Sequence, residues 1–407
     1  MRVWLRASIW PTVLAILSGC SSATLPNRAS PQSFQLPARS AAQLHARCHW
    51  QLVTAANPGS TNAYLYGVAG DAPGDIWSVG NYQQSSSSFR TLAERWNGSA
   101  WSLVQTPNVG TGDNDLVAVA ALSSSDAWAV GISNPTPTAQ TRTLIEHWDG
   151  KSWKVVTNPS PGQLSGLGDV KAVSPTDIWA VGFFYNLAGN QQTLVEHWNG
   201  KAWKVVFSPS PGASYNGLSK LAIVSAKNIW AVGSTSNDGG NTLQTLVERW
   251  NGKTWQVIPS LNGPHALYSG LGALVAIDAN DVWAVGSSES YGTYETSTLV
   301  ERWTGSSWQI VSSPNKGTHG SDLAGIAALA ANDLWSVGSY IDPNNFLPKT
   351  LSEHWNGKAW RIATSPNPGA LEDELHAIAR VGTTLWSVGN QATSSANEPL
   401  IVRLACQ

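Results

Sequence analysis

Six glutamates stand at the same place in six similar stretches of the chain, and each is followed directly by an arginine or a histidine. They are Glu94, Glu146, Glu196, Glu248, Glu301 and Glu353. A carboxyl group beside a second titratable side chain can act as a general acid or base, as carboxyl pairs do in glycoside hydrolysis. A residue that recurs in repeat after repeat more often supports the repeat itself. We therefore predict that these glutamates make a hydrogen bond or ion pair between neighbouring repeats, near the Asn-Gly turn that follows them.

Three histidines form a second set that could do chemistry. His265, His319 and His376 lie in successive repeats, and the last stands beside the acidic run 372–374. Three imidazoles and a carboxylate could surround a divalent metal or serve as general bases. However, these histidines lie 18, 16 and 10 residues before the repeat tryptophan that follows each of them. Because all ligands of one metal must lie about 2 Å from it, we predict no metal site, no cofactor and no catalytic residue.

The first residues have the pattern of an export signal. Arg2 and Arg6 give a positive start, and residues 9–17 form an apolar stretch too short to span a bilayer. The run Leu-Ser-Gly-Cys at 17–20 resembles the bacterial lipobox, in which the cysteine is lipidated. We predict a signal peptide over residues 1–19 and lipid on Cys20, so that the exported chain is anchored to a membrane and faces the cell exterior or the periplasm. The alternative is an ordinary signal peptide cut near the same residues, with Cys20 discarded or left free.

Composition separates the start of the chain from the rest and limits its partners. Residues 20–47 are rich in Ser, Ala, Pro and Gln without periodicity, which indicates a flexible tether. The formal net charge is -2 and only 12% of residues are charged. No basic field is present to attract phosphates, so nucleic acid is excluded as the expected partner. The 22 tryptophans, against a single methionine, require a structural cause.

That cause is a repeat. The pattern D-x-W-[AS]-V-G, with some variation at its first residue, recurs at intervals of 51 to 53 residues. Its tryptophans are Trp77, Trp128, Trp179, Trp230, Trp283, Trp335 and Trp386. Between them lies a second motif with two tryptophans five residues apart, as in T-L-V-E-H-W-N-G-K-A-W at 193–203. We expect the aspartate of the first motif to bond its own backbone in a turn.

Each unit contains four short apolar runs separated by Gly, Pro and Ser. Four antiparallel strands per repeat are the blade of a β-propeller. The runs are apolar on both faces, as expected for a blade packed between two neighbours. No unit has the uninterrupted helical stripe of a solenoid. We predict an all-β fold, a seven-bladed β-propeller with four antiparallel strands per blade, over residues 48–407.

The last unit lacks its fourth strand, and the missing strand is found at the other end of the domain. Residues 49–53 match the outer-strand motif and 57–59 match the turn that follows it. We therefore predict that the N-terminal strand completes the last blade and closes the ring, which removes exposed sheet edges.

Two cysteines fall on either side of this closure. Aligned on the repeat, Cys406 and Cys48 take consecutive positions of the Asn-Gly turn. Their Cα atoms should then lie near the roughly 4.4 to 6.8 Å that a disulfide prefers. Because an exported chain meets an oxidising compartment, we predict a Cys48–Cys406 disulfide. The alternative is two free thiols that happen to align.

The repeats resemble those of the kelch and galactose-oxidase-like propeller superfamily over essentially all of residues 48–407. In that superfamily a strand ending in a glycine pair is followed by a strand with an aromatic residue, a turn and a tryptophan. Here I-W-A-V-G followed by E-H-W-N-G-K-A-W takes these places, although usually with a single glycine and with Trp in place of Tyr. The resemblance implies the fold rather than a function. It does not imply the copper site of galactose oxidase, which needs a Cys crosslinked to a Tyr.

Blade topology divides the connections between two faces of the disc. One face carries the short turns and the other carries all the long loops, where binding residues usually lie. Tyrosines and phenylalanines gather in the long connections of the third to sixth blades, so we predict a recognition surface for glycan or protein there. The candidates are Phe183, Phe184, Tyr185, Tyr215, Tyr268, Tyr291, Tyr294, Tyr340 and Phe346. The alternative is that these rings only pack the loops down.

Three classes of function remain open. We favour a monomeric, lipid-anchored protein that binds a ligand or acts as a protein-interaction scaffold. The alternative is a carbohydrate-active enzyme, a glycoside hydrolase or polysaccharide lyase, with its site on the long-loop face. An assembly factor for a membrane complex is the third class. A cluster of non-repeated acids or bases under the loops would favour the enzyme, and a flat aromatic patch would favour binding.

Overall fold

The computed structural model describes residues 48–59, 62–85, 88–292 and 295–406. The predicted signal peptide, the lipidated Cys20 and the tether fall on residues outside these ranges, as does Tyr294. The described residues form strands, turns and loops, and they include no helix that is long and apolar enough to cross a membrane.

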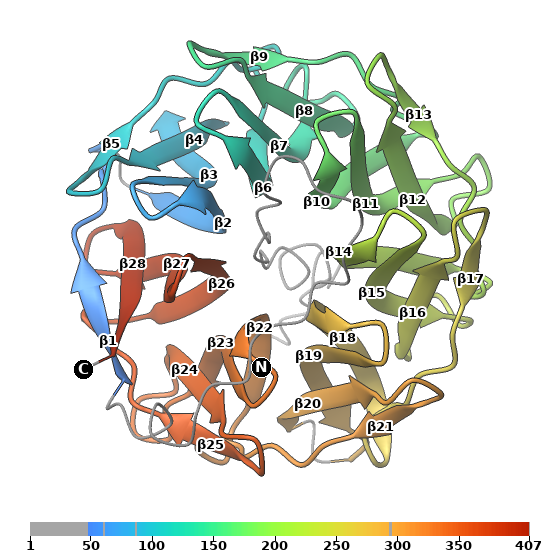
Figure 1. The fold of residues 1–407 in the computed structure, drawn as a ribbon, viewed down its shortest axis with the longest axis vertical. Helices are drawn as coiled ribbons and strands as arrows, with labels where there is room; N and C mark the ends of the chain where they lie inside the picture. Colours follow the sequence, from blue (N-terminus) through green and yellow to red (C-terminus); the bar gives the residue numbers. More distant parts are fainter. Residues whose placement is uncertain (1–47, 60–61, 86–87, 293–294, 407) are drawn as a thin grey trace, which may run out of the picture.

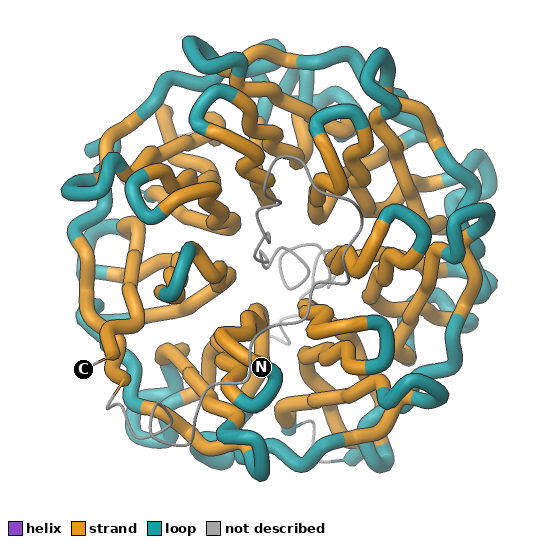
Figure 2. The backbone as a smooth tube through the Cα atoms, viewed as in Figure 1, coloured by secondary structure: helices purple, strands orange, loops and turns teal. Residues whose placement is uncertain are grey.

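Seven four-stranded antiparallel sheets stand around a central axis (Figure 1), which confirms the seven-bladed propeller. We number the blades from 1, built from β2–β5, to 7, built from β26–β28 and β1. The inner strands, which surround the axis, are β2 (Ala63–Ala72), β6 (Asn114–Ser123), β10 (Leu164–Ser174), β14 (Tyr215–Ser225), β18 (Ala266–Asp278), β22 (Ser321–Ala330) and β26 (Asp373–Val381). Strands make up most of each blade, and loops and turns link them (Figure 2).

Three further strands follow in each blade, from the axis outwards. The second strands are β3 (Asp75–Ser85), β7 (Asp126–Ser133), β11 (Asp177–Tyr185), β15 (Asn228–Ser236), β19 (Asp281–Ser290), β23 (Asp333–Ile341) and β27 (Thr384–Ala392). The third strands are β4 (Ser88–Trp96), β8 (Arg142–Trp148), β12 (Gln191–Trp198), β16 (Gln244–Trp250), β20 (Thr296–Trp303), β24 (Pro348–Trp355) and β28 (Asn397–Cys406). The outer strands are β5 (Trp101–Leu103), β9 (Trp153–Val155), β13 (Trp203–Val205), β17 (Trp255–Val257), β21 (Trp308–Ile310), β25 (Trp360–Ala363) and β1 (Cys48–Val53).

The repeated tryptophans hold neighbouring blades together. The motif tryptophan of one blade contacts both tryptophans of the next, as Trp77 contacts Trp148 and Trp153 with ring centroids 5.0 Å away in each case. Such tilted and edge-on contacts add to the burial of large apolar surfaces. Between blades 6 and 7 the pattern is reduced. Trp335 meets Trp50 at 5.8 Å, and Leu404 takes the place of the second ring.

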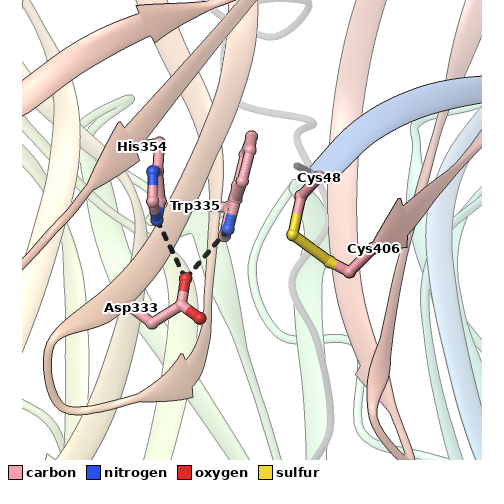
Figure 3. The surroundings of a disulfide bond; sticks show 5 residues. All are labelled: Cys48, Asp333, Trp335, His354 and Cys406. Atoms are coloured by element: carbon pink, nitrogen blue, oxygen red, sulfur yellow. Dashed lines mark hydrogen bonds and ion pairs between the residues drawn. A yellow bond between two sulfur atoms is a disulfide. The ribbon is translucent and has the colours of Figure 1, made fainter. Parts of the chain in front are cut away.

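The ring closes as the sequence predicts. Strand β1 pairs with β28, and the register places Cys48 opposite Cys406. The two cysteines form a disulfide across 358 residues of sequence, with Cα atoms 4.0 Å apart (Figure 3). Trp50 adds a bond to the neighbouring blade, because its Nε1 donates to Ser352 Oγ at 2.8 Å. The N-terminal strand is thus joined covalently to β28 within blade 7, and the side chain of Trp50 joins it to blade 6.

The aspartate of the repeat motif binds side chains of its own blade, where the sequence suggests a bond to its own backbone. In blade 6, Asp333 Oδ1 accepts hydrogen bonds from Trp335 Nε1 and His354 Nε2 at 3.1 and 2.9 Å (Figure 3). Where the third strand has arginine instead, as in blade 1, Arg95 pairs with Asp75 and lies over the ring of Trp77. The alternation of histidine and arginine after the repeated glutamate therefore reflects two ways of filling one site.

Candidate functional site

The six repeated glutamates are fully buried and cannot contact a substrate. Five of them bond the segment that follows the outer strand of the preceding blade. Glu248 Oε2, for example, accepts a bond from Ser208 Oγ at 2.5 Å, and Glu94 Oε2 accepts one from the backbone N–H of Ala56 at 3.0 Å. The predicted bond between neighbouring blades is thus present, but its partner lies beyond the outer strand rather than at the Asn-Gly turn.

The candidate aromatic residues lie in strands more often than in loops. Phe183, Phe184 and Tyr185 end β11, and Tyr215, Tyr268 and Tyr340 also belong to strands. Only Tyr291 and Phe346 stand in described loops, where they are 75% and 65% exposed. Among the candidates in the described ranges, one ring contact joins Phe183 to Tyr185. The six candidates that belong to strands lie in four different blades, blades 3 to 6 (Figure 1).

Several of these rings fill space within the fold. A Cβ added to Gly166 would approach the ring of Phe183 to 3.2 Å, so Phe183 covers the bare backbone of the inner strand beside it. Phe184 packs against the core between blades 2 and 3. On blade 6, Lys316 Nζ lies 4.1 Å from the ring centre of Tyr340. For Phe183 and Phe184, the packing role accounts for the ring position without a ligand.

The three histidines have separate environments. His265 and His319 are exposed, and His319 contacts the ring of Phe346 at 4.9 Å. His376 lies on β26, where it stacks on Tyr66 with ring centroids 5.2 Å apart. In the part of the chain that the structure describes, no three His, Cys, Asp or Glu side chains are grouped so that they could hold a metal ion.

The inner strands differ between blades at two positions. In every blade one inner-strand leucine pairs with the glycine that ends the W-[AS]-V-G motif, as Leu65 pairs with Gly80. A register shift follows this leucine in all seven blades, so the next residue stands in a β-bulge. The residues directly before the leucine are Tyr64, Asp115, Gly166, Gly217, Gly270, Asp322 and Glu374. Those directly after it are Tyr66, Val117, Gly168, Ser219, Gly272, Ala324 and His376.

Acidic and aromatic side chains therefore gather on blades 6, 7, 1 and 2, which are consecutive in the closed ring. Blades 3 to 5 have glycine before the leucine and only glycine or serine after it. We call the first group, with two asparagines from the second strands, the axial cluster. It consists of Tyr64, Tyr66, Asn81, Asp115, Asp322, Glu374, His376 and Asn390. The cluster lies near the start of the inner strands, at the end of the axis that carries the long loops.

Contacts between blades 7 and 1 connect the middle of the axial cluster. Tyr64 and Tyr66 stack with centroids 6.2 Å apart and ring planes within 6°, and Tyr66 continues the stack onto His376. Nδ1 of His376 lies 3.0 Å from the carbonyl oxygen of Leu65, which only accepts, so Nδ1 carries a proton. Nε2 of the same ring faces the carboxylate of Glu374 at 3.4 Å. Hydrogen bonds of His376 thus hold one end of the stack, and ring packing orients the two tyrosines.

The carboxyl groups at the two ends of the cluster are desolvated. Burial raises the pKa of Asp115 to about 6, even though Asn81 Nδ2 donates to its Oδ1 at 2.6 Å. Burial likewise raises the pKa of Asp322 to about 6, against a bond from Ser339 Oγ at 2.6 Å. For Glu374, burial raises the pKa but the bond and charge of His376 outweigh it, and the net direction is downward. Two of these carboxyl groups, those of Asp322 and Glu374, thus stand near the imidazole of His376.

Two buried amide oxygens of the cluster have no hydrogen-bond partner in the described part of the chain. Asn81 and Asn390 are 7% and 3% exposed, and they pair in the strand register with Tyr64 and Glu374. Oδ1 of each asparagine is buried without a donor among the described residues. The orientation of Asn81 is set by its bond to a carboxylate, which only its amide nitrogen can make. Such unpaired buried acceptors are uncommon and cost free energy unless a donor arrives.

On the opposite side of the axis, in blades 3 and 4, charged side chains are hydrogen-bonded to the neighbouring blade. Lys220 Nζ donates to the carbonyl oxygen of Gly168 at 2.8 Å, and Asp169 Oδ2 accepts from the backbone N–H of Leu221 at 2.8 Å. These bonds join blade 3 to blade 4.

On the side of the axial cluster, Asp373 of the acidic run beside His376 accepts hydrogen bonds from Lys349 Nζ at 2.8 Å and from the backbone N–H of Gly369. These groups are therefore engaged in holding the fold.

The sequence prediction names His376 from this cluster but not Tyr64, Tyr66, Asp115 or Asp322. A comparison of the seven inner strands position by position would have revealed them, because each replaces glycine or a small residue of other blades. The predicted recognition sector, blades 3 to 6, overlaps the cluster only at blade 6.

Comparisons with known proteins support the fold. No protein-family model matches the chain, and no curated protein matches it in sequence. Among solved structures, YCF48 bound to D1 peptide is similar at 13% identity, with a TM-score of 0.54 over 88% of this chain and 97% of that chain. YCF48 from Cyanidioschyzon merolae gives 16% identity and a TM-score of 0.52 over 87% and 98% of the two chains. The WD40 propeller domain of Doa1 has 11% sequence identity and a TM-score of 0.52 over 88% of this chain and 97% of that chain. At these identities the similarity shows a propeller fold, and kelch-like kinship stays a prediction.

Proposed function

We propose that this propeller is a protein-interaction scaffold that binds a peptide segment at the long-loop end of its axis, on the axial cluster. The observation that carries the proposal is the asymmetry of the inner strands. Four consecutive blades place partly exposed tyrosine, histidine and carboxyl groups where the other three have glycine or serine beside the same leucine. Non-repeated polar and aromatic groups on a rigid repeat scaffold are what a binding site requires.

Two further points support a peptide as the ligand. The propeller fold is compatible with a protein-interaction scaffold, and the similar YCF48 structure holds a D1 peptide. The rings of the axial cluster are stacked and their orientations are fixed, so they offer a preorganised surface at low entropic cost on binding. A glycan is the alternative ligand class for this face.

Selection of peptides from a displayed random library tests this function. We expect the full chain to select peptides whose affinity falls at least about tenfold in the Tyr64→Ala/His376→Ala variant, as for truncation of a hot spot. Calorimetric titration of synthetic peptides measures the effect. The matched control is Tyr291→Ala/Phe346→Ala, which removes two more exposed rings from the loops of blades 5 and 6 and should leave the affinity unchanged.

Each alternative has its own outcome. If the control variant loses the peptide and the axial variant keeps it, the loop aromatics are the binding site and the axial assignment is wrong. If no peptide is selected while a glycan array gives a ligand, the protein-interaction function is wrong. Thermal melting of both variants establishes that they are folded before the affinities are compared.

We also propose that the scaffold is exported and held at a membrane by lipid on Cys20. The Cys48–Cys406 disulfide supports this location, because such bonds persist in oxidising compartments. In cells expressing the full chain, wild-type protein should enter the detergent phase on Triton X-114 partitioning, and Cys20→Ser should move it to the aqueous phase. A Cys20→Ser chain with unchanged processing and membrane association would contradict lipidation at this residue.

A further inference from the structure

The fully buried polar atoms that the axial cluster leaves without a partner among the described residues are acceptors. They include Oδ1 of Asn81 and Oδ1 of Asn390, both buried without a donor among the described residues. The carboxylates of Asp115 and Asp322 accept side-chain hydrogen bonds at Oδ1, from Asn81 and Ser339 respectively. A ligand that completes these bonds must therefore bring N–H or O–H donors rather than acceptors.

Charge points in the same direction. The cluster holds three carboxyl groups, those of Asp115, Asp322 and Glu374, against a single basic group, the imidazole of His376. Lys349, the ammonium group nearby on blade 6, is already bound to Asp373. A bound cation would lower the cost of holding partly buried carboxylates, whereas an anion would raise it.

Tyr64, which ends the stack and lies 6.3 Å from the tilted ring of Phe89, supplies an aromatic face for that cation. The negative face of an aromatic ring attracts a guanidinium or ammonium group within about 6 Å. The same protein uses this combination within its blades. Arg95 bonds the carboxylate of Asp75 while its guanidinium carbon lies 4.9 Å from the ring centre of Trp77. Arg302 does the same with Asp281 and Trp283, again at 4.9 Å. In these blades carboxylate, aromatic ring and guanidinium form a complete set.

The axial cluster has the carboxylates and the rings of this set but no guanidinium group. We infer that it recognises a cationic side chain of the bound peptide, arginine in preference to lysine. The planar guanidinium group presents five donors and stacks on aromatic faces, whereas an ammonium group presents three donors and no plane. The inference rests on the proposed peptide-binding function and specifies the chemistry of the ligand.

The test replaces the charge on the ligand. Peptides selected by the wild-type chain are expected to contain arginine, and each is then synthesised with citrulline at that position. Citrulline keeps the shape of arginine but is neutral. We expect the citrulline peptides to bind about tenfold or more weakly and lysine peptides to fall between the two, since charge-assisted bonds are about twice as strong as neutral ones. Because the protein is unchanged, this comparison does not depend on the folding of a variant.

The matching change on the protein is Asp322→Asn/Glu374→Gln, which removes two charges and keeps the side-chain sizes. The ratio of citrulline to arginine dissociation constants should fall toward one in this variant. The control is Asp238→Asn, which removes one charge from an exposed loop of blade 4, on the side of the axis where the inner strands carry glycine. Its ratio should equal that of the wild type.

Failure of cation recognition and failure of the proposed peptide-binding function give different results. If peptides bind and citrulline replaces arginine without loss, recognition of a cation is wrong while peptide binding stands. If no peptide binds, the proposed function itself fails. Arginine amide alone is the remaining probe. It should bind far more weakly than the peptide, and equal affinity would overturn the peptide as the carrier of the cation.

Discussion

Reduction of the Cys48–Cys406 disulfide is expected to lower the free energy of unfolding by up to about 6 kcal/mol, the chain-entropy value for so long a closed loop. The bond spans 358 residues and fixes β1 to β28 in the last blade. Without it, β1 is held by six paired residues and by Trp50, which packs on Trp335 and bonds Ser352. Denaturant titration with and without a reducing agent measures the loss.

The effect should be located at the ring closure. Hydrogen exchange of the β1 amides is expected to increase on reduction, while that of blades 3 and 4, on the far side of the ring, stays slow. A Cys48→Ser/Cys406→Ser chain serves as the control, because it should have the lowered stability already and not respond to reductant. Equal denaturation midpoints for oxidised and reduced wild-type protein would show that the disulfide adds nothing to the closure.

Much of the fold could be predicted because it depends on residues that recur. Seven tryptophans at nearly constant spacing identify the units, and a missing strand at one end with a spare strand at the other identifies the closure. The role of the motif aspartate was harder to predict. Asp333 and Trp335 are two residues apart in a strand, so their side chains share a face, but His354 comes from a strand whose register only the structure provides.

The candidate site is harder to predict from the sequence because it depends on β-bulges in the inner strands. His376 and Tyr66 each follow the inner-strand leucine and stand in a β-bulge, and a bulge changes which way a side chain points. Nothing in the spacing of apolar residues marks these bulges. The loop aromatics were the more visible signal, yet Phe183 covers a glycine that only the neighbouring strand reveals. Repeats therefore predict the scaffold, and departures from the repeat at structurally equivalent positions identify the candidate site.

The buried glutamates make the stability of this propeller depend on pH. Burial raises the pKa of Glu94, Glu196, Glu248 and Glu353 to about 8 and that of Glu301 to about 7. Burial also holds the pKa of Glu146 well above its usual range. In the unfolded chain these groups ionise near pH 4.5. Between about pH 4.5 and 8 the folded state therefore binds more protons than the unfolded state, and stability must fall as the pH rises.

Glu146 offers the sharpest test, because neither of its carboxyl oxygens has a hydrogen-bond partner among the described residues. We expect Glu146→Gln to be nearly neutral at pH 5, where the carboxyl group is protonated in the folded protein. At pH 9 the variant should be more stable than the wild type, since the unfolded wild-type chain ionises freely there while the folded protein must keep a buried, unpaired carboxyl group.

Thermal and denaturant melts at both pH values provide the measurement, and Glu372→Gln, at a half-exposed position just before β26, is the matched control that should leave the stability unchanged at both pH values. An equal loss of stability at pH 5 and pH 9 would show instead that Glu146 is ionised in the folded state and that its charge is needed there. The same comparison applies to Glu248, whose bond to Ser208 should reduce the gain at pH 9, because a donor to Oε2 stabilises the ionised form. A larger gain for Glu146→Gln than for Glu248→Gln would therefore attribute the pH dependence to unpaired buried carboxylates rather than to burial in general.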